Sequence, residues 1–217
     1  MAELETDGFV LLGDLWTDAT SLEVADQLGI VDRVEGLAAV QTLVPRMVAG
    51  SPPNTYSGNF GHAEFPLHTD LAHWARPPRY ILLRCIRGAE HVSTRILNGR
   101  HLIGTFGSDR LYATLVQPRR PMRNGKQLLR LLGSSDDFSR DLLRWDSIYL
   151  HPASPASSKV FGEVLEFLRE ARSVEVNLLE RGDTLLIDNW RCLHGRSAAR
   201  EEDRTRHIER VYLKGVR

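Results

Sequence analysis

The chain has few of the features that mark disulfide-rich, secreted or membrane-spanning proteins. It has two cysteines, Cys85 and Cys192, and their number and spacing provide neither a disulfide framework nor a zinc site. No apolar run approaches the roughly 18 residues of a membrane span. The N-terminal MAELETDGF is acidic where a signal peptide would be basic and then apolar. The sequence therefore predicts a soluble, cytoplasmic protein.

The chain also has no excess of charge. It contains 28 basic and 28 acidic side chains, and only three of the basic ones are lysine. A balanced surface produces no global field that favours nucleic acid or an anionic membrane, so we expect a small-molecule partner instead. With 217 residues, residues 1–217 are expected to form a single domain.

The hydrophobic pattern predicts many short strands and one long helix. That helix is expected over residues 155–172, where Ser154 can cap it and an apolar stripe recurs at helical spacing. A shorter helix is expected at 19–28 after a cap at Thr17-Asp18, and two more within 98–117, broken at Gly107. The strands are expected at residues 8–16, 41–48, 80–86, 91–97, 127–132, 141–145, 174–179, 184–188 and 206–213.

The order of these segments favours a double sheet of the jelly-roll type. The strands at 80–86 and 91–97 are expected to pair through a turn at 87–90. Pro45 places the strand at 41–48 at an edge, because proline lacks the N–H of a ladder. Residues 49–66 are rich in Gly, Pro, Asn and Ser and are expected to form a long irregular loop.

A candidate metal site lies directly after that loop. His68 and Asp70 are two residues apart, so on extended backbone their side chains point to the same side. His194, near the other end of the chain, is the candidate third ligand. Two histidines and one carboxylate occupy one face of a metal ion and leave three positions open, which suits non-haem Fe(II) oxygenases.

The motifs around these residues resemble those of a known enzyme family. FPLHTD with PPRYILL behind it, then GDTLLIDNWRCLHGR and RHIERVYL, resemble the taurine dioxygenase and clavaminate synthase-like family of Fe(II)- and 2-oxoglutarate-dependent oxygenases. The resemblance covers residues 54–97 and 174–213 and is thin between them. It implies a mainly β fold with flanking helices, a double-stranded β-helix (jelly roll, cupin-like). It also implies a dioxygenase that uses Fe(II), 2-oxoglutarate and O2 and releases succinate and CO2.

The resemblance implies a role for each matching residue. His68, Asp70 and His194 match the metal ligands. Arg206, assisted by Thr94, matches the arginine that holds the far carboxylate of 2-oxoglutarate, a role that suits the planar two-pronged donor of a guanidinium. Arg210 matches a second arginine at the floor of the site, which in some members binds an anionic group of the substrate.

The sequence indicates less about the substrate than about the metal ligands and the cosubstrate. Asn54, Tyr56 and Ser57 lie on the loop before the first ligand and are candidate substrate contacts, and Arg144 either reaches substrate or pairs with Asp146. Arg210 and Arg144 favour a small anionic or amino-acid-like metabolite. The carboxylate at Asp70 favours hydroxylation, desaturation or a related oxidation over halogenation, because halogenating members have a small residue there. A homodimer that closes the site is a further possibility.

Several alternatives stay open from the sequence alone. His73 is expected on the surface or behind the ligands, and Asp188-Asn189 either orients His194 or simply ends a strand. A non-oxygenase jelly-roll enzyme, an isomerase or hydrolase with Zn or Mn at the same triad, has no use for Arg206. A catalytically silent small-molecule-binding module is the other alternative.

Overall fold

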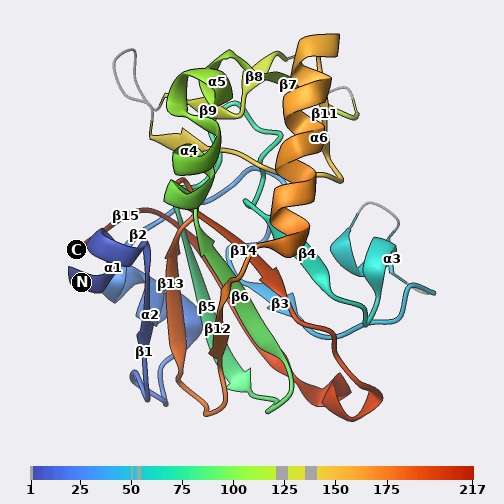
Figure 1. Cartoon of the computed structure of the whole chain (residues 1–217). Coiled ribbons are helices and arrows are strands. Elements are labelled where there is room, and N and C mark those ends of the chain that lie inside the picture. The colour runs from blue at the N-terminus through green and yellow to red at the C-terminus, as the bar shows by residue number, and fades with distance from the viewer. Residues whose placement is uncertain (1, 50, 53–54, 121–126, 135–140) are drawn as a thin grey trace.

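Two antiparallel β-sheets face each other at the centre of the computed structural model (Figure 1). It describes residues 2–49, 51–52, 55–120, 127–134 and 141–217. In this part of the chain, the larger sheet has the order β1-β13-β5-β15-β2, with β3 also paired to β15. Its strands are β1 (Phe9–Leu12), β2 (Gly29–Val31), β3 (Gln41–Leu43), β5 (Tyr80–Arg87), β13 (Thr184–Asp188) and β15 (His207–Val216).

The smaller of the two sheets has the order β12-β6-β14-β4. Its strands are β4 (Phe65–His68), β6 (Ser93–Asn98), β12 (Val174–Asn177) and β14 (Cys192–Arg196). Two minor sheets lie outside this pair and are formed by β7 (Leu115–Pro118), β8 (Leu129–Arg130), β9 (Leu132–Gly133), β10 (Leu142–Leu143) and β11 (Leu150–Pro152). This arrangement confirms the predicted mainly β, double-stranded β-helix fold.

The strands form these sheets because their side chains alternate between two apolar environments. Ile81, Ile96 and Ile187 face the space between the two main sheets, where they pack in one buried cluster. Their neighbours Leu82, Leu97 and Leu186 belong to clusters on the outer faces instead. Each main strand therefore contributes to an inner and an outer core, as expected for sheets covered on both sides.

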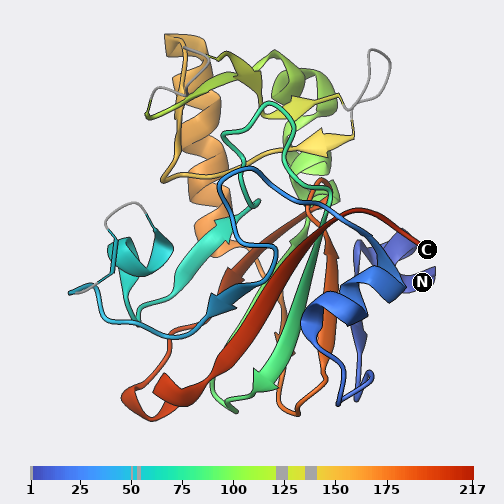
Figure 2. The ribbon, with the colours of Figure 1, turned by 180° about the vertical axis from the view of Figure 1, so that it is seen from behind.

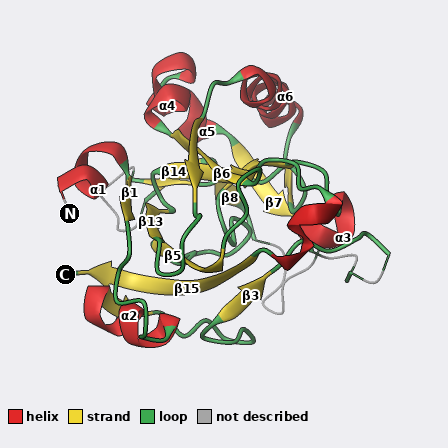
Figure 3. Ribbon diagram, turned by 90° about the horizontal axis from the view of Figure 1, so that it is seen from below, coloured by secondary structure: helices red, strands yellow, loops and turns green. Residues whose placement is uncertain are grey.

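Helices cover the two outer faces, as the end-on view shows (Figure 3). On the smaller sheet lie α4 (Arg100–Phe106), α5 (Ser108–Ala113) and α6 (Pro155–Glu170). On the larger sheet lie α1 (Ala2–Asp7) and α2 (Ser21–Leu28), and Figure 2 shows α2 on the side of β15. None of the helices in the described ranges is long and apolar enough to cross a membrane.

The long helix has the properties that the sequence predicts. Ser154 caps α6 by accepting a hydrogen bond from the backbone N–H of Ser157, and Pro155 occupies the first turn. Its apolar stripe, including Val160 and Val164, packs with Leu193 of β14 in the outer cluster. The two short helices separated at Gly107 are also present, as α4 and α5.

Three local predictions are wrong. β6 does not pair with β5; it lies in the opposite sheet between β12 and β14. The segment 49–66 is not wholly irregular, because it contains α3 (Tyr56–Phe60) and the start of β4. The first α2 turn is capped by Thr20 rather than by Thr17-Asp18, with a capping box in which the Glu23 carboxylate accepts a hydrogen bond from the Thr20 backbone N–H.

Candidate metal centre

Three side chains from distant parts of the chain meet between the two main sheets. His68 ends β4, and His194 lies directly opposite it on the neighbouring strand β14. Asp70 follows two residues after β4, and its Oδ1 lies 3.4 Å from Nε2 of His68 and 3.6 Å from Nε2 of His194. All three donor atoms lie within 4.8 Å of one another, and the residues are only 5–7% exposed. The sequence motifs therefore converge in space, and the donor set is one that a single divalent ion can bind.

The two oxygens of Asp70 have different surroundings. Oδ1 faces the two histidines, whereas Oδ2 accepts hydrogen bonds from Arg210 (2.6 Å) and from the Tyr212 hydroxyl (3.0 Å). Burial alone would raise the pKa of Asp70, but the charge of Arg210 holds that pKa well below its usual value. Asp70 is therefore a carboxylate with one oxygen held by the protein and the other directed at the site.

The His68 ring is oriented by a backbone carbonyl. Its Nδ1 lies 2.9 Å from the carbonyl oxygen of Pro66, which can only accept, so Nδ1 carries the proton and the Nε2 lone pair faces Asp70. Nδ1 of His194 is buried without a hydrogen-bond partner in the described part of the chain. Its ring packs against His68, with centroids 4.6 Å apart. The two imidazoles thus support each other, and only one has its tautomer fixed by the backbone.

Asn189 holds the loop that carries Asp70. Its Oδ1 accepts from the backbone N–H of Asp70 (2.7 Å), and its Nδ2 donates to the carbonyls of Asp70 (3.1 Å) and Pro78 (2.9 Å). The residue is fully buried. The Asp188-Asn189 pair therefore acts on the Asp70 side of the site: Asn189 fixes the loop, and Asp188 pairs with Arg79.

Replacing Asn189 with alanine is expected to destabilise the fold and weaken metal binding together. The change leaves one buried N–H and two carbonyls without partners, a loss of about 2 kcal/mol in the free energy of unfolding. Chemical denaturation and calorimetric metal titration measure the two effects. Asn98→Ala is the matched control, because Asn98 makes an exposed contact to the Asp7 carbonyl. Unchanged stability in Asn189→Ala would contradict this role.

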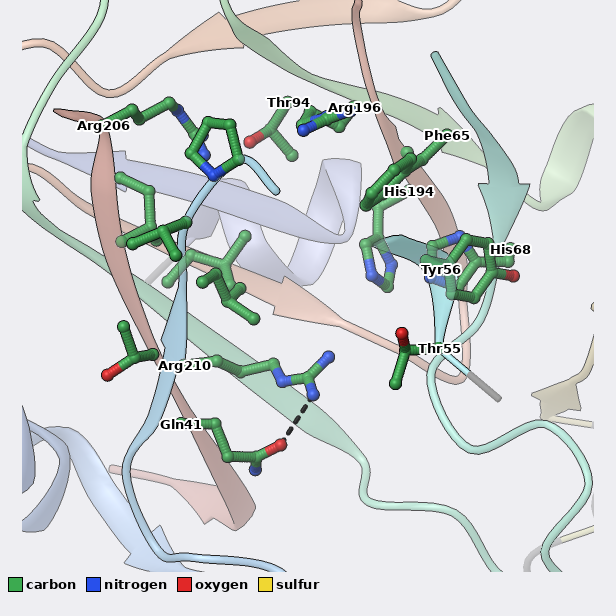
Figure 4. Close-up of a pocket in the computed structure, with 17 residues that line it drawn as sticks. Gln41, Thr55, Tyr56, Phe65, His68, Thr94, His194, Arg196, Arg206 and Arg210 are labelled. Carbon is green, nitrogen blue, oxygen red and sulfur yellow. Dashed lines mark hydrogen bonds between the residues drawn. The ribbon is translucent and has the colours of Figure 1, made fainter. Parts of the chain in front are cut away.

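A cavity of about 320 Å³ opens beside the histidines and ends at Arg206. Figure 4 shows Arg206 across this cavity from His68 and His194, with Thr94 of β6 between Arg206 and His194. Arg206 is 6% exposed, and its Nε is buried without a hydrogen-bond partner among the described residues. Burial lowers its pKa to about 10, so the guanidinium remains charged at neutral pH.

The other two arginines of this cavity already have partners. Arg210 donates to Asp70 and to Gln41, its direct neighbour on β3. Arg196 donates to the carbonyls of Gly61 and Ala63 and stacks over Phe65, with its guanidinium carbon 3.9 Å from the ring centroid. Arg206 is therefore the guanidinium of this cavity that is available to a carboxylate ligand.

A second cavity of about 500 Å³ adjoins the first and shares His68 and Arg210 with it. His68, Asp70 and Tyr212 line it near the metal site, and Arg119 and Arg120 lie along its lining. His73 also contributes, and its Nε2 accepts from Trp74 while burial lowers its pKa. The metal site thus has one cavity toward Arg206 and another toward Arg119, an arrangement with room for two different small molecules.

The structure gives the predicted substrate contacts different positions. Tyr56 lines both cavities, whereas Ser57, on the same helix, is not among the residues that line either one. Arg144 is buried and donates to the carbonyls of Ala72, Trp74 and Ala75, so it neither reaches the cavities nor pairs with Asp146. Arg144 therefore fixes the loop after Asp70, which corrects its predicted role. Asn54 lies outside the described residues.

The fold and this donor set define a class: a double-stranded β-helix protein with a His, Asp, His metal site at one end of a cavity that carries a buried arginine. Sequence comparison is consistent with that class. Residues 117–212 match the family described as taurine catabolism dioxygenase TauD, TfdA family. L-lysine 3-hydroxylase from Catenulispora acidiphila is 28% identical over 172 residues, which are 69% of this chain and 45% of that protein. The chain thus spans under half the length of this relative.

Solved structures share the fold. Asparagine oxygenase in complex with Fe(II), 2S,3S-3-hydroxyasparagine and succinate superposes with a TM-score of 0.68 at 18% identity, covering 98% of this chain and 77% of that one. The non-haem iron oxygenase OrfP in complex with Fe, succinate and (3S)-hydroxy-L-Arg gives a TM-score of 0.62 at 21% identity, covering 81% and 56%. These structures confirm the predicted fold, and the family match over residues 117–212 agrees with the resemblance that the sequence motifs indicate.

Proposed function

We propose that this chain, as one oxygenase domain, is an Fe(II)- and 2-oxoglutarate-dependent hydroxylase of a small metabolite. The observation that carries the proposal is the pairing of the His68, Asp70, His194 cluster with Arg206 across one cavity, a buried arginine whose side chain has no hydrogen-bond partner among the described residues. A metal-dependent isomerase or hydrolase needs the first feature but not the second. Burying a guanidinium without a partner is costly, so its presence supports an anionic ligand that binds there.

The residues fit the groups that this activity requires. His68, Asp70 and His194 would hold Fe(II), and Arg206 with the Thr94 hydroxyl would hold the far carboxylate of 2-oxoglutarate. When bound, Fe(II) would activate O2, with 2-oxoglutarate as the co-reductant: the keto acid would be converted to CO2 and succinate, which takes one oxygen atom, and the other oxygen atom would enter a substrate C–H bond. Asp70 contributes one negative charge beside two neutral imidazoles, and Arg210 and Tyr212 keep its second oxygen away from the site.

The second cavity is the proposed substrate site. Its lining includes the ligands His68 and Asp70, so a molecule bound there has a carbon close to the reacting centre, while the aromatic rings of Tyr56 and Tyr149 exclude water. The relatives named above act on free amino acids or hold hydroxylated amino acids, which supports an amino acid or a similar metabolite. Arg119 and Arg120 pair with no carboxylate among the described residues, and this supports an anionic group on the substrate.

A coupled assay tests the proposal. Protein loaded anaerobically with Fe(II) is mixed with 2-oxoglutarate, air and one member of a panel of acidic, neutral and basic amino acids, and both succinate and product mass are measured in the same sample. We expect one substrate to stimulate succinate release and to gain one oxygen atom in proportion. Asp70→Ala is the inactive control. Turnover of a substrate by Zn- or Mn-loaded protein without 2-oxoglutarate would overturn the proposal.

A further inference from the structure

The ring of Tyr56 lies flat against one of the proposed metal ligands. Tyr56 begins α3, and its ring stacks on the imidazole of His68 with centroids 4.1 Å apart and an interplanar angle of 23°. The helix start is fixed by Thr55, whose side chain accepts from the backbone N–H of Gly58. A tyrosine is thus delivered to His68 by a short helix in a segment that the composition alone marks as a loop.

The hydroxyl of Tyr56 is anchored at its other end. It donates to Oδ2 of Asp146 (2.9 Å), a residue that is 2% exposed. Oδ1 of Asp146 accepts from the backbone N–H groups of Ile148 (2.7 Å) and Tyr149 (2.9 Å). The carboxylate is therefore fixed by the backbone, and it fixes the phenol in turn.

This chain of contacts adds a second restraint on the His68 ring. Rotation of the imidazole about its bond to Cβ would break the hydrogen bond from Nδ1 to Pro66 and carry Nε2 away from Asp70. The Tyr56 ring stacked on the imidazole face opposes the same rotation. Tyr56 also lines both cavities, as His68 does, so its ring lies where the Arg206 side of the site meets the Arg119 side.

We infer that Tyr56 is a positioning residue for His68, held in place by Asp146, and that its ring sets both the affinity for metal and the separation of the two cavities. The inference rests on the proposed metal site. Partners behind a metal-binding histidine orient the ring and tune its ligand strength, and their loss commonly weakens metal binding by 10–100-fold. Here the partner acts through the ring face rather than through a ring nitrogen.

Three variants separate this role from general packing. Tyr56→Leu removes the stacked ring, and Tyr56→Phe keeps the ring but loses the anchor to Asp146. Phe60→Leu is the matched control, because Phe60 lies on the same helix and packs on Tyr56 (6.0 Å) without lining either cavity. Metal affinity is measured by anaerobic calorimetry with Fe(II), and by Co(II) absorption, which reports the ligand geometry. Thermal unfolding of the metal-free proteins measures the effect on the fold.

We expect Tyr56→Leu to bind Fe(II) about 10-fold more weakly and to change the Co(II) spectrum. Tyr56→Phe is expected to recover most of the affinity, and Phe60→Leu to match the unaltered protein. In turnover, Tyr56→Leu should release more succinate per oxidised substrate, because the wall between the cavities is lost. If Tyr56→Leu is folded and its metal affinity and Co(II) spectrum are unchanged, or if Phe60→Leu weakens binding equally, the inference is wrong. If the unaltered protein binds no metal, the proposed function itself fails.

Discussion

Alanine at position 194 is expected to abolish succinate production and Fe(II) binding while the fold is kept. His194 supplies one of three donors, and the remaining His68 and Asp70 cannot occupy one face of the ion alone. The fold should survive because Nδ1 of His194 makes no hydrogen bond within the described residues, so no buried partner is left unpaired. Iron content after anaerobic loading and succinate release measure the effect.

The control for this substitution is a histidine of ordinary surroundings. His91 has a side chain 49% exposed, and its contact with Glu202 is 3.9 Å long, so His91→Ala should bind Fe(II) normally. His68→Ala and Asp70→Ala should behave as His194→Ala does. Iron affinity and succinate release that persist in His194→Ala would show that the ligand assignment is wrong.

Replacing Arg206 with alanine is expected to raise the 2-oxoglutarate concentration needed for half-maximal succinate release by about 100-fold. Loss of a buried, hydrogen-bonded charge pair typically costs 2–5 kcal/mol, and about 3 kcal/mol corresponds to this factor. Because the metal ligands are untouched, Fe(II) affinity should stay close to that of the unaltered protein. Arg206→Lys should recover only part of the loss, since an ammonium lacks the two parallel donors of a guanidinium.

Arg204→Ala is the matched control for Arg206. Arg204 is 71% exposed at its side chain and contacts only Glu201, at 3.5 Å, among the described residues. It should leave the 2-oxoglutarate requirement unchanged. A normal requirement in Arg206→Ala would instead favour a metal-dependent isomerase or hydrolase, which has no dicarboxylate cosubstrate to hold.

The periodicity of the sequence is sufficient to predict the elements that bury a regular apolar face. The stripe of α6 and the mostly apolar run of β5 are of this kind, because their burial depends on residues close in sequence. The convergence of His68, Asp70 and His194 also follows from motifs, since His68 ends β4, Asp70 follows it closely, and His194 lies on the neighbouring strand β14. These strong local signals explain why the predicted elements and metal ligands agree with the structure.

The wrong predictions concern residues whose contacts are made with segments far away in the sequence. β6 follows β5 after a short connection that reads as a hairpin turn, yet β6 finds its partners in β12 and β14, far along the chain. Arg144 reads as a free cation next to Asp146, but three carbonyls of the loop after Asp70 bind it. Nothing near these residues in the sequence encodes such contacts.

The same reason explains why Asn189 and Tyr56 have other roles in the structure than those that the sequence indicates. The sequence predicts that Asn189 orients His194 or ends a strand. In the structure its side chain forms hydrogen bonds with the backbone of Asp70, which is far from it in the sequence. The link from Asp146 through Tyr56 to His68 joins three segments and carries no motif. The one available signal was compositional: aromatic residues in a polar loop directly before a metal ligand.

The most direct measurement of the central claim is the visible spectrum of the anaerobic protein after Fe(II) and then 2-oxoglutarate are added. A keto acid chelated to ferrous iron gives a weak charge-transfer band, and the account predicts this band for the unaltered chain and its loss in His194→Ala. Fe(II)-loaded protein that gives no band at saturating 2-oxoglutarate would contradict it.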